Sequence, residues 1–177
     1  MKILIFLSFV LFYQSVISQI TYNTSSEYYP TTKKSIELLT SINCDSLSMK
    51  LVDEINLYRT QNGLGVLMFD KVAFDYAKSH IDFLTKTKTY KHSDISKSNF
   101  ILENLNMINN NGSDLNFDEN WIQSVPTLFL NSWKKSPGHN SNLLNKYVTK
   151  VGISITSIVY TQNGKYFHEM RVVMVAN

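Results

Sequence analysis

The C-terminal part of the chain has the pattern that most limits the fold. Val151, Ile153 and Ile155 alternate with small or polar residues, which is the period of a half-buried β-strand. Asn163-Gly164 follows, and this dipeptide is the strongest short signal for a hairpin turn. Residues 166–176 are therefore predicted to return as a second strand that pairs antiparallel with the first.

Helical patterns precede this hairpin. Apolar residues recur at helical spacing over residues 46–61, where Gly63 supplies a stop, and a second helix is expected after Asp70, a good N-cap. A third helix is predicted over residues 124–133, with Ser124 as its cap and Pro126 in its first turn. Because helices precede strands and do not alternate with them, the order predicts an α+β fold with an antiparallel sheet.

The segments between these elements are more polar. Residues 86–99 and the Asn/Gly-rich residues 109–114 are predicted to be loops, with a short strand over residues 101–108 between them. Residues 137–138 are expected to force a turn and to open a short helix.

The N-terminus has the pattern of a signal peptide over residues 1–18. Lys2 supplies a short positive region, residues 3–13 are almost wholly apolar, and Ser18 is a small residue before a plausible cleavage site. The alternative is an uncleaved anchor, although the run is short for a membrane span and no later run reaches the roughly 20 apolar residues that a span needs. The mature protein is therefore expected to be secreted or held in the cell envelope, with no transmembrane segment.

The remaining chain is expected to divide into a polar linker or arm over residues 19–43, with a short helix around residues 35–42, and one domain over residues 44–177. Cys44 is the single cysteine, so no intrachain disulfide is possible and core packing alone must hold the domain together. The thiol could still pair between chains. The net charge is only +3 and no long basic run occurs, which argues against a nucleic-acid partner.

Three residues are the candidates for chemistry. His92 lies in a polar loop and His139 follows a Pro-Gly turn, so neither is expected to be core packing. Glu103 lies among apolar residues, where a carboxylate needs a partner. Two imidazoles and a carboxylate are sufficient to bind a divalent ion with open positions, or to act in general acid–base catalysis. They could equally hydrogen-bond to one another and brace the structure without any ligand.

Other polar residues have simpler interpretations. His80 lies on an apolar helix face and is expected to be a satisfied core histidine, while His168 and Glu169 should point to opposite faces of a strand. Asn104 and Asn142 are expected to tie loops together. Ser136 lies near a histidine, but no third orienting group is evident, so a nucleophilic role is disfavoured.

Five motifs follow one another in order from residue 51 to the C-terminal hairpin. They are Glu54-Ile55-Asn56-Leu57-Tyr58-Arg59 with Gly63 and Leu67-Met68-Phe69-Asp70, His92-Ser93, Glu103-Asn104, Trp133 with Ser136-Pro137-Gly138-His139 and Asn142-Leu143-Leu144, and Val151-Gly152-Ile153. Together they resemble the CAP superfamily of cysteine-rich secretory proteins, antigen 5 and pathogenesis-related proteins, in its short bacterial, SCP-like form. Glu103-Asn104 follows His92-Ser93 at an interval that resembles the family's first His and its Gly-Glu-Asn motif, with Leu102 in place of the Gly.

The resemblance implies a three-layer α-β-α sandwich with a small central antiparallel sheet. It also implies a cleft in which His92 and His139 hold a divalent metal, Zn or Mg, weakly, while Glu103 stands for the first of the family's two Glu residues. Ser136 occupies the position of the second Glu, so the family's tetrad is reduced to a triad. Glu103, Asn104, Ser136 and Trp133 are expected to support the cleft.

Three functions are compatible with these residues. The first is a secreted binding module whose cleft presents a groove to an apolar, glycan or peptide ligand. The second is a metal-dependent hydrolase with Glu103 as the base, although an enzymatic role is less expected because the second acid is missing. The third is a non-catalytic interaction domain of the cell envelope.

Overall fold

The structure is a computed structural model that describes residues 30–111 and 117–177. The expected signal peptide and residues 19–29 of the expected linker lie outside the described residues. The elements run along the chain in this order: α1 (Pro30–Thr40), α2 (Cys44–Gln61), β1 (Met68–Phe69), α3 (Lys71–Thr87), the 3₁₀ turn η1 (Ile95–Lys97), β2 (Leu102–Asn111), α4 (Glu119–Lys135), α5 (Pro137–Leu143), β3 (Lys150–Gln162) and β4 (Lys165–Ala176).

The four strands form one sheet in the order β1-β3-β4-β2. Strands β3 and β4 form the predicted hairpin, and β2 pairs antiparallel with the outer side of β4. Asn163 and Gly164 both have positive φ, 51° and 71°, which is the backbone that a tight two-residue hairpin turn requires. The two-residue strand β1 runs parallel to β3, so the sheet is mixed, with three long antiparallel strands.

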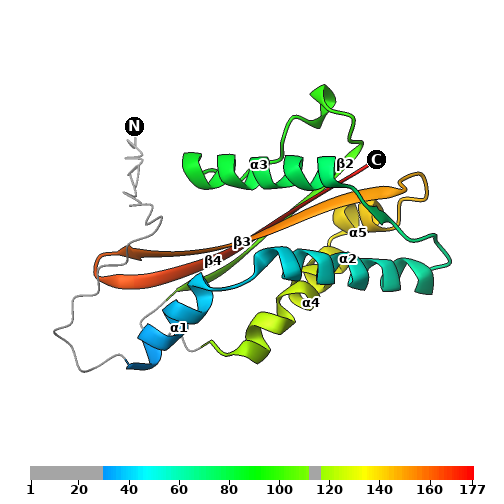
Figure 1. Cartoon of the computed structure of the whole chain (residues 1–177). Helices are drawn as coiled ribbons and strands as arrows, with labels where there is room; N and C mark the ends of the chain where they lie inside the picture. The colour runs from blue at the N-terminus through cyan, green and yellow to red at the C-terminus, as the bar shows by residue number, and fades with distance from the viewer. Residues whose placement is uncertain (1–29, 112–116) are drawn as a thin grey trace, which may run out of the picture.

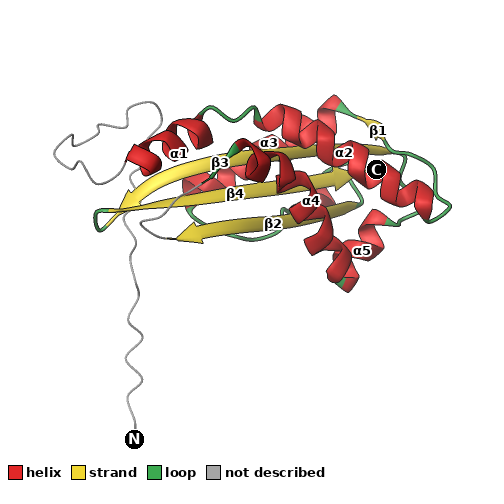
Figure 2. Cartoon of the chain, turned by 90° about the horizontal axis from the view of Figure 1, so that it is seen from below, coloured by secondary structure: helices red, strands yellow, loops and turns green. Residues whose placement is uncertain are grey.

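The sheet lies between two helical layers, as the predicted three-layer α-β-α sandwich requires. Helix α3 covers one face, and helices α1, α2 and α4 cover the other (Figures 1 and 2). The larger core lies between the sheet and helices α2 and α4, and a smaller core lies under α3. Residues of β4 alternate between the two, because successive strand residues point to opposite faces.

Helix α4 begins earlier than the sequence predicts. Asp118 is its N-cap, with the Asp118 Oδ1 atom accepting a hydrogen bond from the Trp121 backbone N–H at 2.8 Å. Ser124 is not a cap, since its hydroxyl donates to the Trp121 carbonyl at 2.6 Å within the helix, and Pro126 lies inside the helix. Packing decides this boundary, because the inward face of α4 buries residues on both sides of Pro126 in the larger core.

Strand β2 is longer than the predicted strand. The Asn content of residues 109–111 predicts a loop, but Asn109 pairs with Glu169 and Asn111 pairs with Phe167 of β4. The long partner strand supplies backbone hydrogen bonds that offset the weak strand preference of Asn. Residues 112–114, the rest of that expected loop, lie outside the described residues.

Helix α1 falls within the expected linker and corresponds to the short helix predicted there. Its residues Ile36 and Leu39 are buried, and the Leu39 carbonyl accepts a hydrogen bond from the Ser157 hydroxyl of β3 at 2.8 Å. The packed unit therefore begins before Cys44. Cys44 is half-buried at the start of α2, where burial raises the pKa of its thiol.

Candidate functional site

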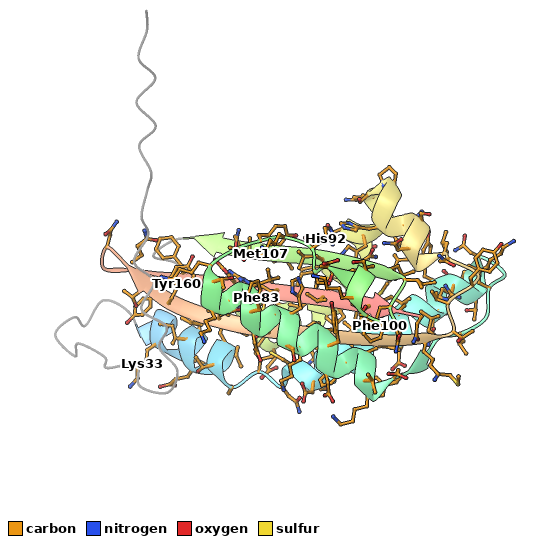
Figure 3. All side chains as sticks on the ribbon, turned by 90° about the horizontal axis from the view of Figure 1, so that it is seen from above. Lys33, Phe83, His92, Phe100, Met107 and Tyr160 are labelled. Atoms are coloured by element: carbon orange, nitrogen blue, oxygen red, sulfur yellow. The ribbon has the colours of Figure 1, made fainter. Side chains whose placement is uncertain are left out.

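The three candidate residues come from three elements that meet at the β2 edge of the sheet. Glu103 lies on β2, His92 lies on the loop between α3 and η1, and His139 lies in α5. The expected loop between α3 and β2 is confirmed, apart from the short turn η1 and the last residues of α3. Figure 3 shows His92 on this loop beside β2.

Glu103 is buried among donors. Its side chain is only 3% exposed, and its Oε1 atom lies 2.7 Å from His92 Nδ1. The backbone N–H of Ser93 donates to Oε1 at 3.1 Å and to Oε2 at 3.3 Å, and the Ser93 hydroxyl also donates to Oε2. Both carboxylate oxygens are therefore occupied by groups of one short loop, which explains how a carboxylate is accommodated on an otherwise apolar strand.

His92 is oriented by this contact. A neutral imidazole carries one N–H, and the carboxylate beside Nδ1 favours the proton on that nitrogen. The Nε2 lone pair is then directed away from Glu103. The His92 side chain is 58% exposed, so the free nitrogen belongs to an accessible ring.

His139 faces His92 across the edge of β2. Their ring centroids are 6.3 Å apart, and the His139 ring is 6.5 Å from that of Trp133. Burial, and secondarily the nearby His92, lower the pKa of His139. His139 is therefore neutral at pH 7 and can offer a nitrogen lone pair.

Two asparagines tie α5 to β2. The Asn104 amide donates to the His139 carbonyl at 3.1 Å, and the Asn142 amide donates to Asn104 Oδ1 at 2.8 Å and to the Glu103 carbonyl at 3.2 Å. Asn104 is fully buried. This network agrees with the prediction that both residues tie segments together, and it fixes the position of His139 relative to Glu103.

Trp133 and Ser136 lie near His139. Trp133 is fully buried in the larger core beneath His139. Ser136 ends α4 and begins α5, where its carbonyl accepts a hydrogen bond from the Asn140 N–H at 2.8 Å. The change of direction at Ser136-Pro137 therefore directs His139 toward β2.

Two residues of the site were not predicted from the sequence. His80 of α3 is buried and hydrogen-bonded, as a satisfied core histidine should be, with Nε2 3.0 Å from the Lys91 carbonyl. The same nitrogen lies 4.0 Å from Glu103 Oε2, so His80 also borders the site. Ser93 supplies the donors described above. Only the adjacency of Ser93 to His92 could have indicated its role, and the spacing of His80 gave no such signal.

The described residues place limits on a metal site. Within residues 30–111 and 117–177, no group of three or more His, Cys, Asp or Glu side chains is arranged to hold a metal ion. Glu103 faces His92, and its oxygens already accept hydrogen bonds. Two imidazoles remain as direct donors, with Glu103 behind one of them. Imidazole nitrogens suit Zn²⁺ better than Mg²⁺, which prefers oxygen ligands.

Comparison with known families identifies the family of the chain. The sequence model of the cysteine-rich secretory protein family, CAP, matches residues 52–176, which is most of the chain. The chain belongs to the CAP family. The match begins within α2, after α1. No curated protein sequence matches the chain closely enough to count as a relative.

Three solved structures are similar to this CAP domain. An outer surface protein from Borrelia burgdorferi is 21% identical, with a TM-score of 0.47, and the alignment covers 77% of this chain and 96% of that one. An extracellular protein containing a SCP domain from Bacillus anthracis is 20% identical (TM-score 0.47; 71% and 40% covered). A cysteine-rich secretory protein from Staphylococcus aureus is 16% identical (TM-score 0.40; 77% and 41% covered).

Proposed function

We propose that this CAP domain is a secreted or envelope-bound binding module that holds a divalent metal ion weakly on His92 and His139. The observation that supports this most directly is the 2.7 Å contact between His92 Nδ1 and Glu103. Metal-binding histidines commonly donate the other ring N–H to a carboxylate, which fixes the tautomer and makes the ligating nitrogen more basic. Glu103 is thus an orienting residue and not a direct ligand.

The neutral state of His139 and the exposure of His92 also favour this role. Two imidazoles as the direct ligands make a weak site that leaves positions for a ligand or water. When bound, Zn²⁺ would supply a Lewis acid at the mouth of the site. We also propose that the domain presents a groove beside this metal to an apolar, glycan or peptide ligand.

Hydrolysis is the less favoured alternative. A general base must lie within hydrogen-bond reach of the water that it activates. The Glu103 side chain is 3% exposed, and its oxygens accept hydrogen bonds from His92 and Ser93, so access for a substrate water is poor. Ser136 stands where larger family members have a second Glu, and it cannot replace a carboxylate.

A secreted or envelope location is supported by the apolar N-terminal run and by the family to which the domain belongs. Among the helices of residues 30–111 and 117–177, none is long and apolar enough to cross a bilayer.

Calorimetric titration of Zn²⁺ into the protein tests the metal site. The wild type should bind Zn²⁺, and the His92→Ala/His139→Ala double variant should lose this binding. Glu103→Gln should weaken it about 10- to 100-fold, as is typical when a carboxylate that orients a ligating histidine is changed. His168→Gln is the matched histidine control and should keep wild-type affinity.

Equal binding by the wild type and the double variant would refute the site. If the double variant loses binding but Glu103→Gln binds Zn²⁺ as tightly as the wild type, then His92 and His139 are ligands and Glu103 does not orient His92. Mg²⁺ in place of Zn²⁺ should give no measurable heat, because two imidazoles match its ligand preference poorly.

A further inference from the structure

His80 joins helix α3 to the loop that carries His92. Its side chain is 8% exposed, and its Nε2 atom lies 3.0 Å from the Lys91 carbonyl. A carbonyl oxygen can only accept a hydrogen bond, so Nε2 carries the ring proton and is the donor. Buried polar side chains usually make such bonds. This one differs from an ordinary core contact because the accepting carbonyl belongs to the residue next to a proposed metal ligand.

The loop is attached to the fold on both sides of His92. On the N-terminal side, His80 of α3 holds the Lys91 carbonyl. On the C-terminal side, the Ser93 backbone N–H donates to Glu103 Oε1 and Oε2 at 3.1 and 3.3 Å. His92 itself has Nδ1 2.7 Å from the same carboxylate. Three consecutive residues are therefore held, two of them by β2 and only Lys91 by α3.

The His80 ring also lies close to Glu103 and Phe83. Its Nε2 atom is 4.0 Å from Glu103 Oε2, which is too long for a hydrogen bond but places the N–H side of the imidazole near the carboxylate. The rings of His80 and Phe83 stack with centroids 6.3 Å apart, and Lys91 Nζ lies 5.8 Å from the Phe83 ring. Figure 3 shows Phe83 on α3 and His92 on the loop. Lys91 is thus attached to α3 through its backbone and its side chain.

We propose that His80 is a positioning residue that sets how tightly His92 holds a metal ion. Because His92 is a metal ligand only under the proposed function, the role of His80 rests on that function. Glu103 fixes the tautomer and direction of the His92 imidazole, and His80 fixes the backbone from which this imidazole projects. Without the attachment to α3, only a fraction of the molecules would have His92 in place, and the apparent affinity for the ion would fall by that fraction.

Replacements at position 80 of the full chain separate this role from core packing, with calorimetric titration of Zn²⁺ as the first measurement. His80→Leu has no donor for the Lys91 carbonyl and should lower Zn²⁺ affinity about tenfold, because that carbonyl loses its partner. His80→Gln places an amide N–H near the position of Nε2 and should bind within about threefold of the wild type. If His80→Leu does not fold, His80→Asn takes its place, because its shorter amide does not reach the carbonyl.

His168→Leu is the matched control for the loss of a buried histidine. His168 is fully buried and its Nε2 lies 3.0 Å from the Ser157 hydroxyl. It pairs with Asn110, near the opposite end of β2 from Glu103. The control variant should therefore lose stability but bind Zn²⁺ as tightly as the wild type.

Nitrogen NMR of the metal-free protein gives a second measurement that does not depend on metal binding. In the wild type and in His80→Gln, the ring nitrogens of His92 should show one tautomer, with the proton on Nδ1. In His80→Leu these signals should move toward averaged values, and the Ser93 amide should exchange faster with solvent, because the loop opens more often. A variant that only weakens the core, such as His168→Leu, should leave the His92 signals unchanged.

The two measurements separate failure of the metal site from failure of the positioning role. If the wild type binds no Zn²⁺, the proposed function fails and His80 sets no metal affinity. If the wild type binds Zn²⁺ but His80→Leu binds equally tightly with unchanged His92 signals, the positioning role is wrong and the metal site stands. The role is also overturned if His168→Leu loses as much affinity as His80→Leu, or if His80→Gln does not restore it.

Discussion

At the residue scale, Arg59 is a buried charged side chain that holds three segments of the fold together. It is 2% exposed, its Nε donates to the Gly65 carbonyl at 2.9 Å, and its Nη1 donates to the carbonyls of Leu143 and Asn145 at 2.8 and 2.9 Å. One guanidinium thus joins the end of α2, the loop before β1 and the end of α5. These three hydrogen bonds give a physical reason for an arginine at the end of the family motif Glu54-Ile55-Asn56-Leu57-Tyr58-Arg59.

Replacement of Arg59 by Met should lower the free energy of unfolding by about 3 kcal/mol, because three carbonyls lose a charged donor. Urea denaturation measures this. Lys50→Met is the control, since Lys50 makes one exposed hydrogen bond, to the Gln123 carbonyl, and its loss should cost less than about 1 kcal/mol. Equal losses in the two variants would show that the buried junction adds nothing beyond an exposed contact.

His168 should make the fold sensitive to acid. It is fully buried, its Nε2 lies 3.0 Å from the Ser157 hydroxyl, and burial lowers the pKa of His168 to about 4. The folded state therefore keeps this imidazole neutral at pH values where the unfolded chain, with a pKa near 6.5, is already protonated. Its contribution to stability is complete above about pH 6.5 and is lost as the pH falls toward 4, which amounts to about 3 kcal/mol.

Urea midpoints measured between pH 7 and pH 4 test this expectation. His168→Gln keeps a hydrogen-bonding amide near Ser157 but cannot be protonated, so its stability should fall less steeply over this interval than that of the wild type. The remaining slope would come from groups shared by both proteins, including His139, whose pKa burial also lowers. If stability falls with pH equally steeply in the wild type and in His168→Gln, then the pKa of His168 does not differ between the folded and unfolded states.

Only some residues of the candidate site could be predicted from the sequence. His92, Glu103 and His139 could be chosen as candidates from the sequence, because the two histidines lie in expected loops, the carboxylate lies among apolar residues, and the family motifs relate all three. The role of His80 was not predictable, because helical spacing assigns it to a buried face but does not say that this face lies over Glu103. Neither could the donors of Ser93 be foreseen, since they depend on the path of the loop.

At the element scale, α3 approaches β3 closely at Gly152. A Cβ atom on Gly152 would lie 2.0 Å from the Phe74 backbone nitrogen and 2.1 Å from the Ala73 carbonyl carbon. Backbone therefore packs on backbone, and neither atom belongs to a side chain that could turn aside. Gly152→Ala should force α3 away from the sheet and cost about 4 kcal/mol or more.

Chemical denaturation of Gly152→Ala beside Gly138→Ala tests the packing argument. A Cβ at Gly138 meets nothing within 4 Å in the short helix α5, so that variant should be neutral or slightly stabilised. A Gly152→Ala protein as stable as the wild type would show that α3 and β3 can separate without loss, and the close approach would then have no energetic importance.

The elements themselves were predictable to different degrees. The β3–β4 hairpin and the start of α3 at Asp70 follow from local signals, a positive-φ turn and a capping carboxylate, that the structure uses directly. The start of α4 did not follow, because Ser124-x-Pro126 imitates a helix start that core packing overrides. The length of β2 depends on its partner β4, and no local pattern in residues 109–111 indicates such a partner.

At the scale of the whole molecule, side-chain amides protect both edges of the sheet. Asn56 occupies the N–H and the carbonyl of Leu67 beside β1, and Asn142 occupies the Glu103 carbonyl on β2. On β2, the Tyr90 hydroxyl also reaches the Leu105 carbonyl at 3.4 Å. Unprotected sheet edges are templates for pairing with other chains, so these contacts favour a sheet that does not extend by self-association.

Removal of the two amides should therefore promote association. In Asn56→Ala/Asn142→Ala the edges regain free backbone groups, and sedimentation velocity should show larger species at concentrations where the wild type sediments as one species. Each lost amide should also lower the free energy of unfolding by about 1 kcal/mol. The sedimentation runs are therefore made well below the melting temperature of the double variant. Asn62→Ala is the control, because the Asn62 amide donates to the Tyr58 carbonyl at the end of a helix and protects no strand. If the double variant sediments like the control, the sheet edges are protected by the shortness of β1 and by α5 beside β2. The two amides would then only hold local structure, Asn56 at Leu67 and Asn142 at Glu103 and Asn104.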